Sequence, residues 1–149
     1  MRAFRFSLQK VLELRSHRER EKEVVLGRAL GLLHEIETSL AVLGEERLRA
    51  AAEQFSRAHG AEEILAFDRY IRRLDESQER FLREAAMAEL KLAEAREEYL
   101  EAARDRKALD KLKERRLAEY REARKLEETK NLDDISQGAP ARRAVTGMV

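Results

Sequence analysis

Histidine is the side chain best suited to exchange protons near neutral pH, so the three histidines are the first candidates for chemistry. They are His17, His34 and His59, and they lie far apart along the 149-residue chain. The dipeptide His34-Glu35 begins like a zinc-protease motif, but that motif needs a second histidine four residues after the first, and this position holds Thr38. With no cysteine, the chain also lacks a thiol nucleophile and thiolate metal ligands. We therefore expect no metal and no cofactor.

Neighbouring carboxylates are the second possible source of chemistry. Glu97-Glu98 and Glu127-Glu128 offer such pairs, but acid–base catalysis needs a concave pocket that holds the substrate. Both pairs lie in strongly charged stretches that are typical of a helix surface, and no glycine-rich phosphate-binding loop is present. The sequence therefore predicts a protein that is not an enzyme and has no small-molecule substrate.

The longest regular pattern runs from Ile64 to Ala123, where apolar residues recur in steps of three and four. An average spacing of about 3.5 residues keeps one narrow helix face turned toward a partner, which predicts a coiled-coil helix. A second helical pattern precedes it, and its apolar face widens between Val24 and Leu43. Such a width indicates either a bundled portion or a surface for another protein.

The strongest turn signal is His59-Gly60, because glycine suits a left-handed residue after a helix and Glu62 and Glu63 suit the first turn of the next. We expect an all-α fold of two long helices, about 4–58 and 61–130, forming an antiparallel coiled-coil hairpin. At the start, either Ser7 caps the first helix or the helix begins a turn earlier. Residues 1–130 would form the hairpin domain and residues 131–149, which lose the periodicity, a flexible tail.

Charge is distributed unevenly along the chain. Residues 1–28 hold eight basic and four acidic residues, residues 104–125 hold ten and five, and residues 29–103 hold ten and seventeen. A hairpin would bring the two basic segments together at the end that carries the termini. This basic end suits an acidic protein surface or a nucleic acid. Interleaved acids and few exposed aromatic residues argue against nucleic acid.

No apolar run approaches the roughly 18 residues that span a bilayer, and the first residues lack a signal-peptide core. We therefore expect a cytoplasmic location.

Three stretches resemble a known family. The opening Phe4-Arg5-Phe6-Ser7-Leu8-Gln9-Lys10-Val11-Leu12-Glu13-Leu14-Arg15, followed by Glu19 and Glu23, resembles the N-terminal signature of FliJ, the small coiled-coil protein of the bacterial flagellar export apparatus. Residues 64–74 are similar to the family's stretch after the turn, and residues 130–135 resemble its usual close.

The resemblance implies a function. FliJ-like proteins form a hairpin similar to the central stalk of rotary ATPases, sit in or under the hexameric ring of the export ATPase (FliI) and promote its assembly. They also contact the export gate protein (FlhA) and escort export chaperones. The expected role is therefore non-enzymatic, in flagellum biogenesis, type III protein export and motility. The expected place is the cytoplasm, peripherally associated with the inner membrane at the flagellar base.

The resemblance and the charge pattern together suggest two sets of contact residues. The basic end offers arginines for the ATPase, namely Arg15, Arg18, Arg20, Arg106, Arg115 and Arg116. The region after the turn offers Phe67, Tyr70 and Leu74 for the gate, with Leu43 across from them. Tyr70 lies beside the seam and is the best exposed candidate, whereas the heptad spacing of the other three favours the hairpin core.

Two alternatives stay open. The same fold would serve as the stalk of a virulence type III secretion system. A coiled-coil scaffold or an RNA-binding hairpin is a different class, and RNA binding would depend strongly on salt.

Overall fold

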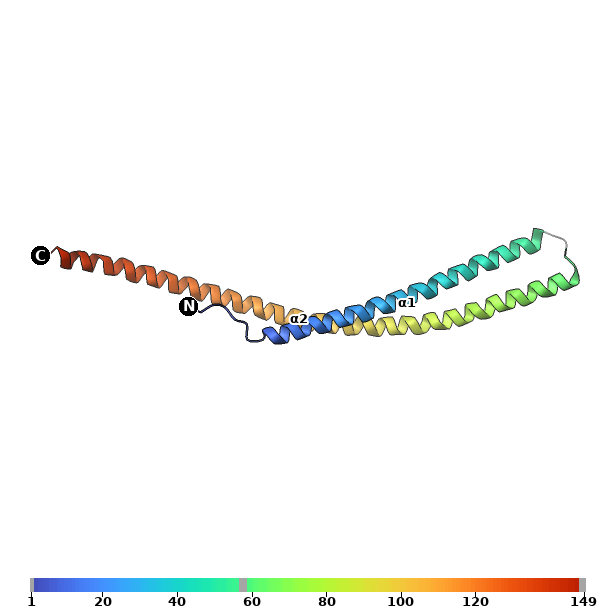
Figure 1. The fold of residues 1–149 in the computed structure, drawn as a ribbon, viewed down its shortest axis with the longest axis horizontal. Helices are drawn as coiled ribbons and strands as arrows, with labels where there is room; N and C mark the ends of the chain where they lie inside the picture. Colours follow the sequence, from blue (N-terminus) through green and yellow to red (C-terminus); the bar gives the residue numbers. More distant parts are fainter. Residues whose placement is uncertain (1, 57–58, 148–149) are drawn as a thin grey trace. The chain divides into compact units, whose positions relative to one another are not determined.

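The computed structural model describes residues 2–56 and 59–147, with the backbone alone for 139–146. Two helices account for nearly all of this length: α1 (Gln9–Ser56) and α2 (Ala61–Thr146) (Figure 1). The described residues contain no strand. The helices pack against each other in opposite directions, so the predicted all-α antiparallel hairpin is confirmed. Within residues 2–56 and 59–147, neither helix offers an apolar stretch of the length that a bilayer requires.

The chain divides into two compact units. The terminal unit comprises Met1–His17 and Ala103–Val149, and the hairpin unit comprises Arg18–Ala102. The terminal unit has seventeen basic and ten acidic residues in sequence, a net charge of +7, and the hairpin unit has fourteen and twenty, a net charge of −6. The two signs of charge predicted for the two ends of the hairpin therefore belong to separate units.

Polar contacts between α1 and α2 fix the register of the hairpin unit. Lys22 Nζ lies 2.8 Å from Glu98 Oε2, and Arg47 Nη1 lies 3.0 Å from Asp75 Oδ1. The two residue numbers sum to 120 in the first pair and to 122 in the second. In this unit, the numbers of two residues that face each other on α1 and α2 therefore add up to about 121.

The core of the hairpin unit is built largely from alanine. Ala88, Ala95 and Ala102 are buried and lie seven residues apart on α2, with Leu92 between the first two. A heptad of small residues lets two helix backbones approach closely, which explains why so few atoms suffice to close this seam. Closer to the turn the seam opens: among the described residues from 37 to 73, none is buried.

In the terminal unit, α1 and α2 meet around buried Leu12 and Leu109. Arg15 Nη1 donates to the carbonyl oxygen of Asp105 at 2.9 Å, and Lys113 Nζ donates to Gln9 Oε1 at 2.9 Å. These contacts hold the first turns of α1 against α2 and keep the register seen in the hairpin unit.

The segment before α1 does not continue the helix. α1 begins at Gln9, whose backbone N–H donates to the Phe6 carbonyl at 3.1 Å, so a start near Phe4 is wrong. The helix starts two residues after Ser7, and the capping role of Ser7 stays a prediction. The reason for the later start is packing against α2. The rings of Phe4 and Tyr120 lie 5.6 Å apart between centroids, and the Tyr120 hydroxyl donates to the Arg2 carbonyl at 2.8 Å. A helical segment would turn away from these partners.

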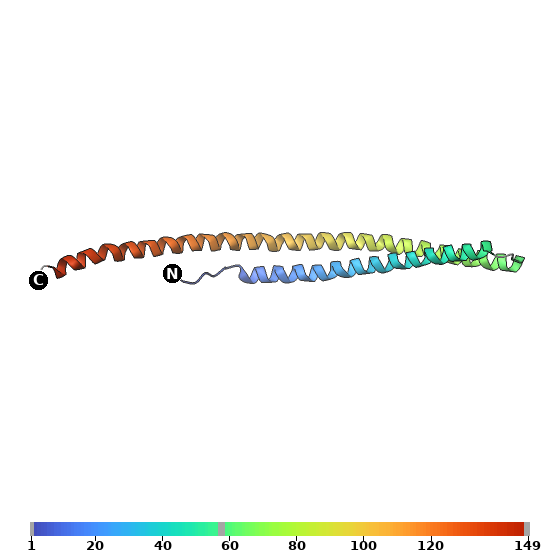
Figure 2. The same cartoon turned by 90° about the horizontal axis from the view of Figure 1, so that it is seen from above.

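The predicted end of the second helix at Lys130 is wrong, because α2 continues to Thr146 through Gly138 and Pro140. Apolar periodicity reports where a helix has a packing partner, and the partner of α2 ends at the N-terminal segment beside Tyr120. Every residue from 121 to 138 is exposed. Figure 2 shows α2 extending past the N-terminal segment. Local contacts support it, among them the 3.0 Å ion pair of Arg124 with Glu128. The flexibility of this segment stays a prediction.

The predicted turn position is confirmed, since α2 begins at Ala61 with Glu62 and Glu63 in its first turn. The predicted end of the first helix at Ala58 falls outside the described residues. The reason given for Gly60 is wrong: no described glycine has a positive φ. Open space surrounds Gly60, so the turn uses it without needing the left-handed conformation.

Candidate functional site

The six arginines suggested for ATPase binding fall into both units. Arg15, Arg106, Arg115 and Arg116 belong to the terminal unit, and Arg18 and Arg20 to the hairpin unit. Their role in binding stays a prediction, but the structure shows which of them are engaged within the chain.

Two of these arginines make internal contacts that limit what they offer to a partner. Arg15 is half-buried and donates to the Asp105 carbonyl of the opposite helix. Arg106 is half-buried and forms an ion pair with Asp110 one turn along α2. Arg116 is more exposed, and its Nη1 lies 3.3 Å from Glu119 Oε2. Replacing Arg15 would therefore disturb the pairing of α1 with α2 as well as any outer surface.

A row of cations that the sequence-based set mostly missed lies on the outer face of α2. Arg104, Lys107, Lys111 and Arg115 follow at steps of three, four and four residues, which places them on one helix face. All four are exposed, and none forms an ion pair with another residue that the structure describes. Leu109, two residues from both Lys107 and Lys111, is buried, so this face points away from α1. We call these four residues the cationic stripe.

The signal for the cationic stripe was present in the sequence. Of its members only Arg115 is among the six arginines predicted for the ATPase contact. Stepping back from Arg115 by four, four and three residues would have found the rest.

The hairpin unit shows a different electrostatic pattern. The hydrogen bond and the charge of Lys22 lower the pKa of Glu98 from its ordinary value, partial desolvation opposes this shift, and the charge of Arg18 adds to it. Lys22 and Arg18 therefore act on an acidic partner within the unit. Arg20 lies two residues from each of them, on the opposite side of α1, and is exposed.

The four residues suggested for the export gate all lie in the hairpin unit but do not form one patch. Leu74 is buried, Phe67 and Leu43 are half-buried, and Tyr70 is 37% exposed. By the register, Leu43 lies opposite Gln78, about one turn from Leu74 and about three turns from Phe67. Leu74 therefore serves the core, and Tyr70 is the member that a partner can reach.

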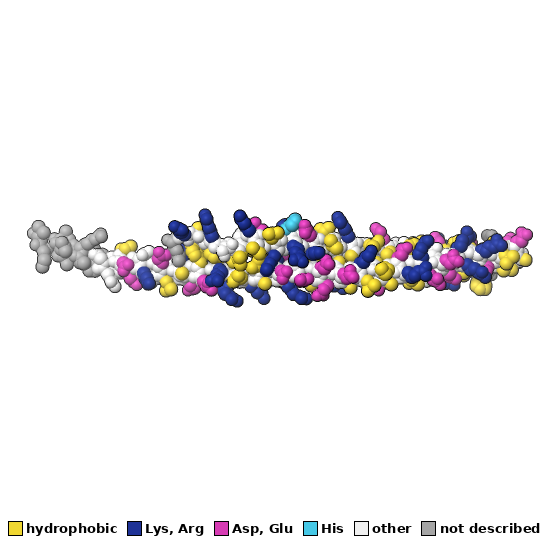
Figure 3. All heavy atoms as spheres, turned by 90° about the horizontal axis from the view of Figure 1, so that it is seen from below, with side chains coloured by type: hydrophobic (Ala, Val, Ile, Leu, Met, Phe, Trp, Pro, Cys, Tyr) yellow, Lys and Arg dark blue, Asp and Glu magenta, His cyan; other side chains and the backbone are white. Residues whose placement is uncertain are grey.

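Large apolar side chains near the turn are more accessible than the residues selected from the sequence. Those exposed on the two helices are Leu48, Phe55, Ile64 and Leu65, and Phe55 reaches 91% exposure. Figure 3 shows apolar side chains interrupting the charged surface on the visible face of the helices. We call these four residues and Tyr70 the turn-proximal apolar surface. Of these five residues only Ile64 falls on the apolar seam that the sequence predicts, so the spacing that locates the core does not locate this surface.

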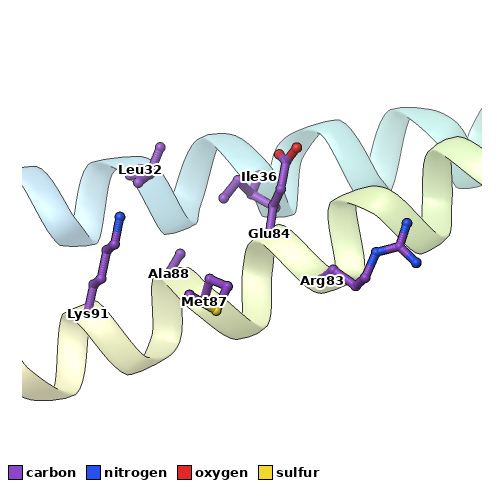
Figure 4. Close-up of a pocket in the computed structure, with 7 residues that line it drawn as sticks. All are labelled: Leu32, Ile36, Arg83, Glu84, Met87, Ala88 and Lys91. Carbon is purple, nitrogen blue, oxygen red and sulfur yellow. The ribbon is translucent and has the colours of Figure 1, made fainter.

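A hollow of about 320 Å³ lies between α1 and α2 of the hairpin unit (Figure 4). Its lining consists of Leu32, Ile36, Arg83, Glu84, Met87, Ala88 and Lys91. Ile36 and Ala88 are buried and form its floor, while Leu32 and Met87 are exposed walls. The hollow exists because alanine at position 88 leaves space beside its larger neighbours. It combines an apolar surface with charged ends and contains no histidine.

In the described part of the chain, no three His, Asp or Glu side chains gather in a way that would hold a metal ion. His59 Nδ1 lies 2.7 Å from Glu63 Oε2 at the start of α2, a local contact beside the turn. The surfaces that remain are charged and apolar faces of helices, which suit binding to other proteins.

The comparisons with known proteins agree with the architecture. A family model described as "Flagellar FliJ protein" matches residues 4–144. No curated protein and no solved structure matches the chain.

Proposed function

The chain belongs to the FliJ family, a component of the flagellar export apparatus, and from this premise we propose that it acts as a stalk-like adaptor of the export ATPase (FliI). In this role it binds the ATPase, promotes assembly of its ring and takes no part in ATP chemistry. It also couples the ATPase to the export gate (FlhA) and escorts export chaperones. Its working place is the flagellar base, peripherally at the inner membrane.

The cationic stripe is the observation that best supports the proposed contact with the ATPase. Its four cations are exposed and lie on the face of α2 opposite the α1 contact. They form no ion pairs with other described residues, so a partner carboxylate does not have to displace an internal one. A net charge of +7 for the terminal unit adds long-range attraction toward an acidic surface.

The gate contact is supported by the turn-proximal apolar surface. Large exposed apolar groups are typical of protein-binding sites, and several lie within a few turns of the hairpin turn on both helices. Tyr70 adds a hydroxyl that can hydrogen-bond to a partner. Phe67 is half-buried beside them, whereas Leu74 contributes by holding the helices in place.

The test is the ATP hydrolysis rate of the same organism's export ATPase across an enzyme concentration series, with and without this chain. We expect stimulation at low ATPase concentration, saturating near one chain per ring, because an adaptor that promotes ring assembly acts below equimolar amounts. Absence of stimulation at every ratio would contradict the proposal. RNA binding that weakens with salt would then favour the RNA-binding hairpin.

A charge-reversed pair tests the cationic stripe itself. Lys107→Glu with Lys111→Glu should reduce stimulation at least about tenfold, because like charges would face the partner surface. The matched control is Arg69→Glu with Arg96→Glu in the hairpin unit, which changes net charge equally at exposed arginines. Circular dichroism should show unchanged helicity in both. Equal loss of stimulation in the two variants would mean that only overall charge matters.

A further inference from the structure

The hollow lined by Leu32, Ile36, Met87 and Ala88 has an open apolar wall that the hairpin leaves uncovered. Ala88 is 3% exposed, whereas Leu32 is 45% and Met87 is 59% exposed. A two-helix seam normally covers its flanking apolar residues with long polar side chains from the opposite helix. Here Ala88 leaves space at the buried floor, and although Glu84 and Lys91 rise at its sides, Leu32 and Met87 stay exposed to water.

The apolar surface continues along α1 beyond the hollow. Val25 lies seven residues before Leu32, two helical turns along the same face, and is exposed. A small molecule would fill the hollow and leave Val25 uncovered. An occupant that covers both must be elongated and apolar at heptad spacing, which describes one face of an amphipathic helix.

The charged residues at the two ends of the hollow indicate which charges a partner helix should carry beside its apolar face. Arg83 and Lys91 each lie four residues from Met87, one on either side, and neither forms an ion pair with another described residue. Figure 4 shows Lys91 reaching toward α1 beside Leu32, and Arg83 pointing away from the hollow at its other end. Their Cα atoms are about 12 Å apart along α2. Two carboxylates about two turns apart on an incoming helix would match them.

Glu84 does not cancel these cations. In Figure 4 its side chain rises beside Ile36 toward α1, while Arg83 points in another direction. The acid therefore lies between the cations, where it disfavours a second acid at the centre of an incoming helix. The pattern required of the occupant is acidic at both ends and apolar in the middle.

A second copy of this chain does not meet that requirement. In a two-fold antiparallel pairing centred on Met87, residues equally distant from the axis meet, so Arg83 of one copy would face Lys91 of the other. Like charges would then approach each other at both ends of the contact. This arrangement is therefore unfavourable for a second copy, and the charge pattern fits a different chain better.

We propose that this groove, comprising Val25 and the residues that line the hollow, binds an amphipathic helix of a partner protein through a leucine-type apolar stripe flanked by two carboxylates. Apolar side chains of the partner enter between Leu32 and Met87, and its carboxylates pair with Arg83 and Lys91. The groove lies in the hairpin unit and contains no residue of the cationic stripe or the turn-proximal apolar surface. The proposal therefore stands independently of the ATPase and gate contacts.

The test measures binding of a labelled synthetic helical peptide to the full chain by fluorescence anisotropy. The peptide has about 18 residues, leucine at heptad core positions and two glutamates seven residues apart on one flank. A matched peptide carries lysine in place of both glutamates. We expect the acidic peptide to bind at least about tenfold more tightly than the basic one, with the difference shrinking as salt is raised. Equal binding of the two peptides, or no binding of either, would overturn the proposal.

Two protein variants locate the site. Met87→Glu places a carboxylate in the apolar wall and should weaken binding of the acidic peptide at least about tenfold. Leu90→Glu is its control, since Leu90 is 62% exposed on the same helix and does not line the hollow. Both changes are at exposed positions, so circular dichroism should show intact helices. Equal weakening by the two variants would place binding elsewhere.

Sedimentation of the chain without peptide tests whether a second copy of this chain covers the groove. We expect the wild-type chain and the Met87→Glu variant to sediment alike, because no second copy occupies the groove. A wild-type dimer that Met87→Glu converts to a monomer would show that a second copy covers the groove, and the proposal would be wrong.

Discussion

Two regions of the hairpin unit use the same two helices in different ways. From Ala88 to Ala102, alanines at heptad spacing bury a continuous seam. From 37 to 73, no described residue is buried, although this region contains Phe55, Ile64 and Leu65. The difference shows that large apolar side chains do not by themselves close a two-helix seam. Close approach of the backbones does so, and small side chains permit it.

The comparison also separates helix formation from packing. Both regions are helical wherever they belong to α1 or α2, yet only one has a buried seam. Local interactions such as the Arg72–Asp68 ion pair maintain helical structure near the turn without tertiary burial. Stability should therefore be concentrated near the alanines and binding capacity near the turn.

The largest effect is expected from a charge placed in the alanine seam. Ala95→Glu should lower the free energy of unfolding by at least about 3 kcal/mol, because it forces a large carboxylate into a closely packed contact. Urea denaturation followed by circular dichroism measures the change. Ala86→Glu, at an exposed alanine of the same helix, is the control and should cost less than about 0.5 kcal/mol. Similar costs for the two would show that the seam is not the source of stability.

A smaller difference is expected between the amides of the two regions. Amides of α2 between 88 and 102 should exchange with deuterium at least about tenfold more slowly than those between 61 and 73, because opening the buried seam requires separation of the helices. Hydrogen exchange followed by mass spectrometry measures this contrast. Uniform protection along α2 would contradict the division into a closed and an open region.

A pH-dependent contribution is expected at the Lys22–Glu98 ion pair, beside the alanine seam. Because the folded-state pKa of Glu98 lies below its ordinary value of 4.5, the pair stabilises the fold above that value and loses its effect as the pH falls through the lowered pKa. Glu98→Gln should reduce stability slightly near pH 7, and this reduction should shrink as the pH falls through the folded-state pKa. Urea midpoints across a pH series from neutral to acid provide the measurement, and a reduction that stays constant across the series would exclude this linkage.

The smallest effect is expected from removing an apolar group near the turn. Phe55→Ser should change the free energy of unfolding by less than about 0.5 kcal/mol, because the side chain is 91% exposed and loses little contact. The same variant should weaken gate binding if the turn-proximal apolar surface is the contact. A large loss of stability would contradict this expectation, because it would show that the Phe55 side chain packs against other residues in solution.

The sequence predicted the hairpin and the start of α2 because both depend on local signals: heptad spacing, a glycine after a histidine, and acids in a first turn. It misplaced the start of α1 because the Phe4–Tyr120 contact joins residues more than a hundred positions apart. It misplaced the end of α2 because apolar spacing stops where the packing partner ends, whereas the helix itself continues to Thr146.

The candidate surfaces were less predictable than the fold. Heptad position identified Leu74 as core, which is correct. It gave no reason to select Phe55, which lies off the seam and is exposed because no part of the described structure covers it. Sequence also could not distinguish Arg15, which donates to a backbone carbonyl, from Arg115, which faces solvent without an ion pair in the described residues. The partner assignments for these residues stay predictions.

The register of the hairpin unit constrains how the length of such a chain can change during evolution. The Lys22–Glu98 and Arg47–Asp75 pairs tie the two arms at two points. Deletion of one residue in either arm between these ties would rotate every following side chain by about 100° and turn the seam away from its partner. Matched losses or gains of seven residues in both arms would preserve it. Beyond Tyr120, α2 has no opposing arm among the described residues, so single-residue insertions there would leave the paired seam intact.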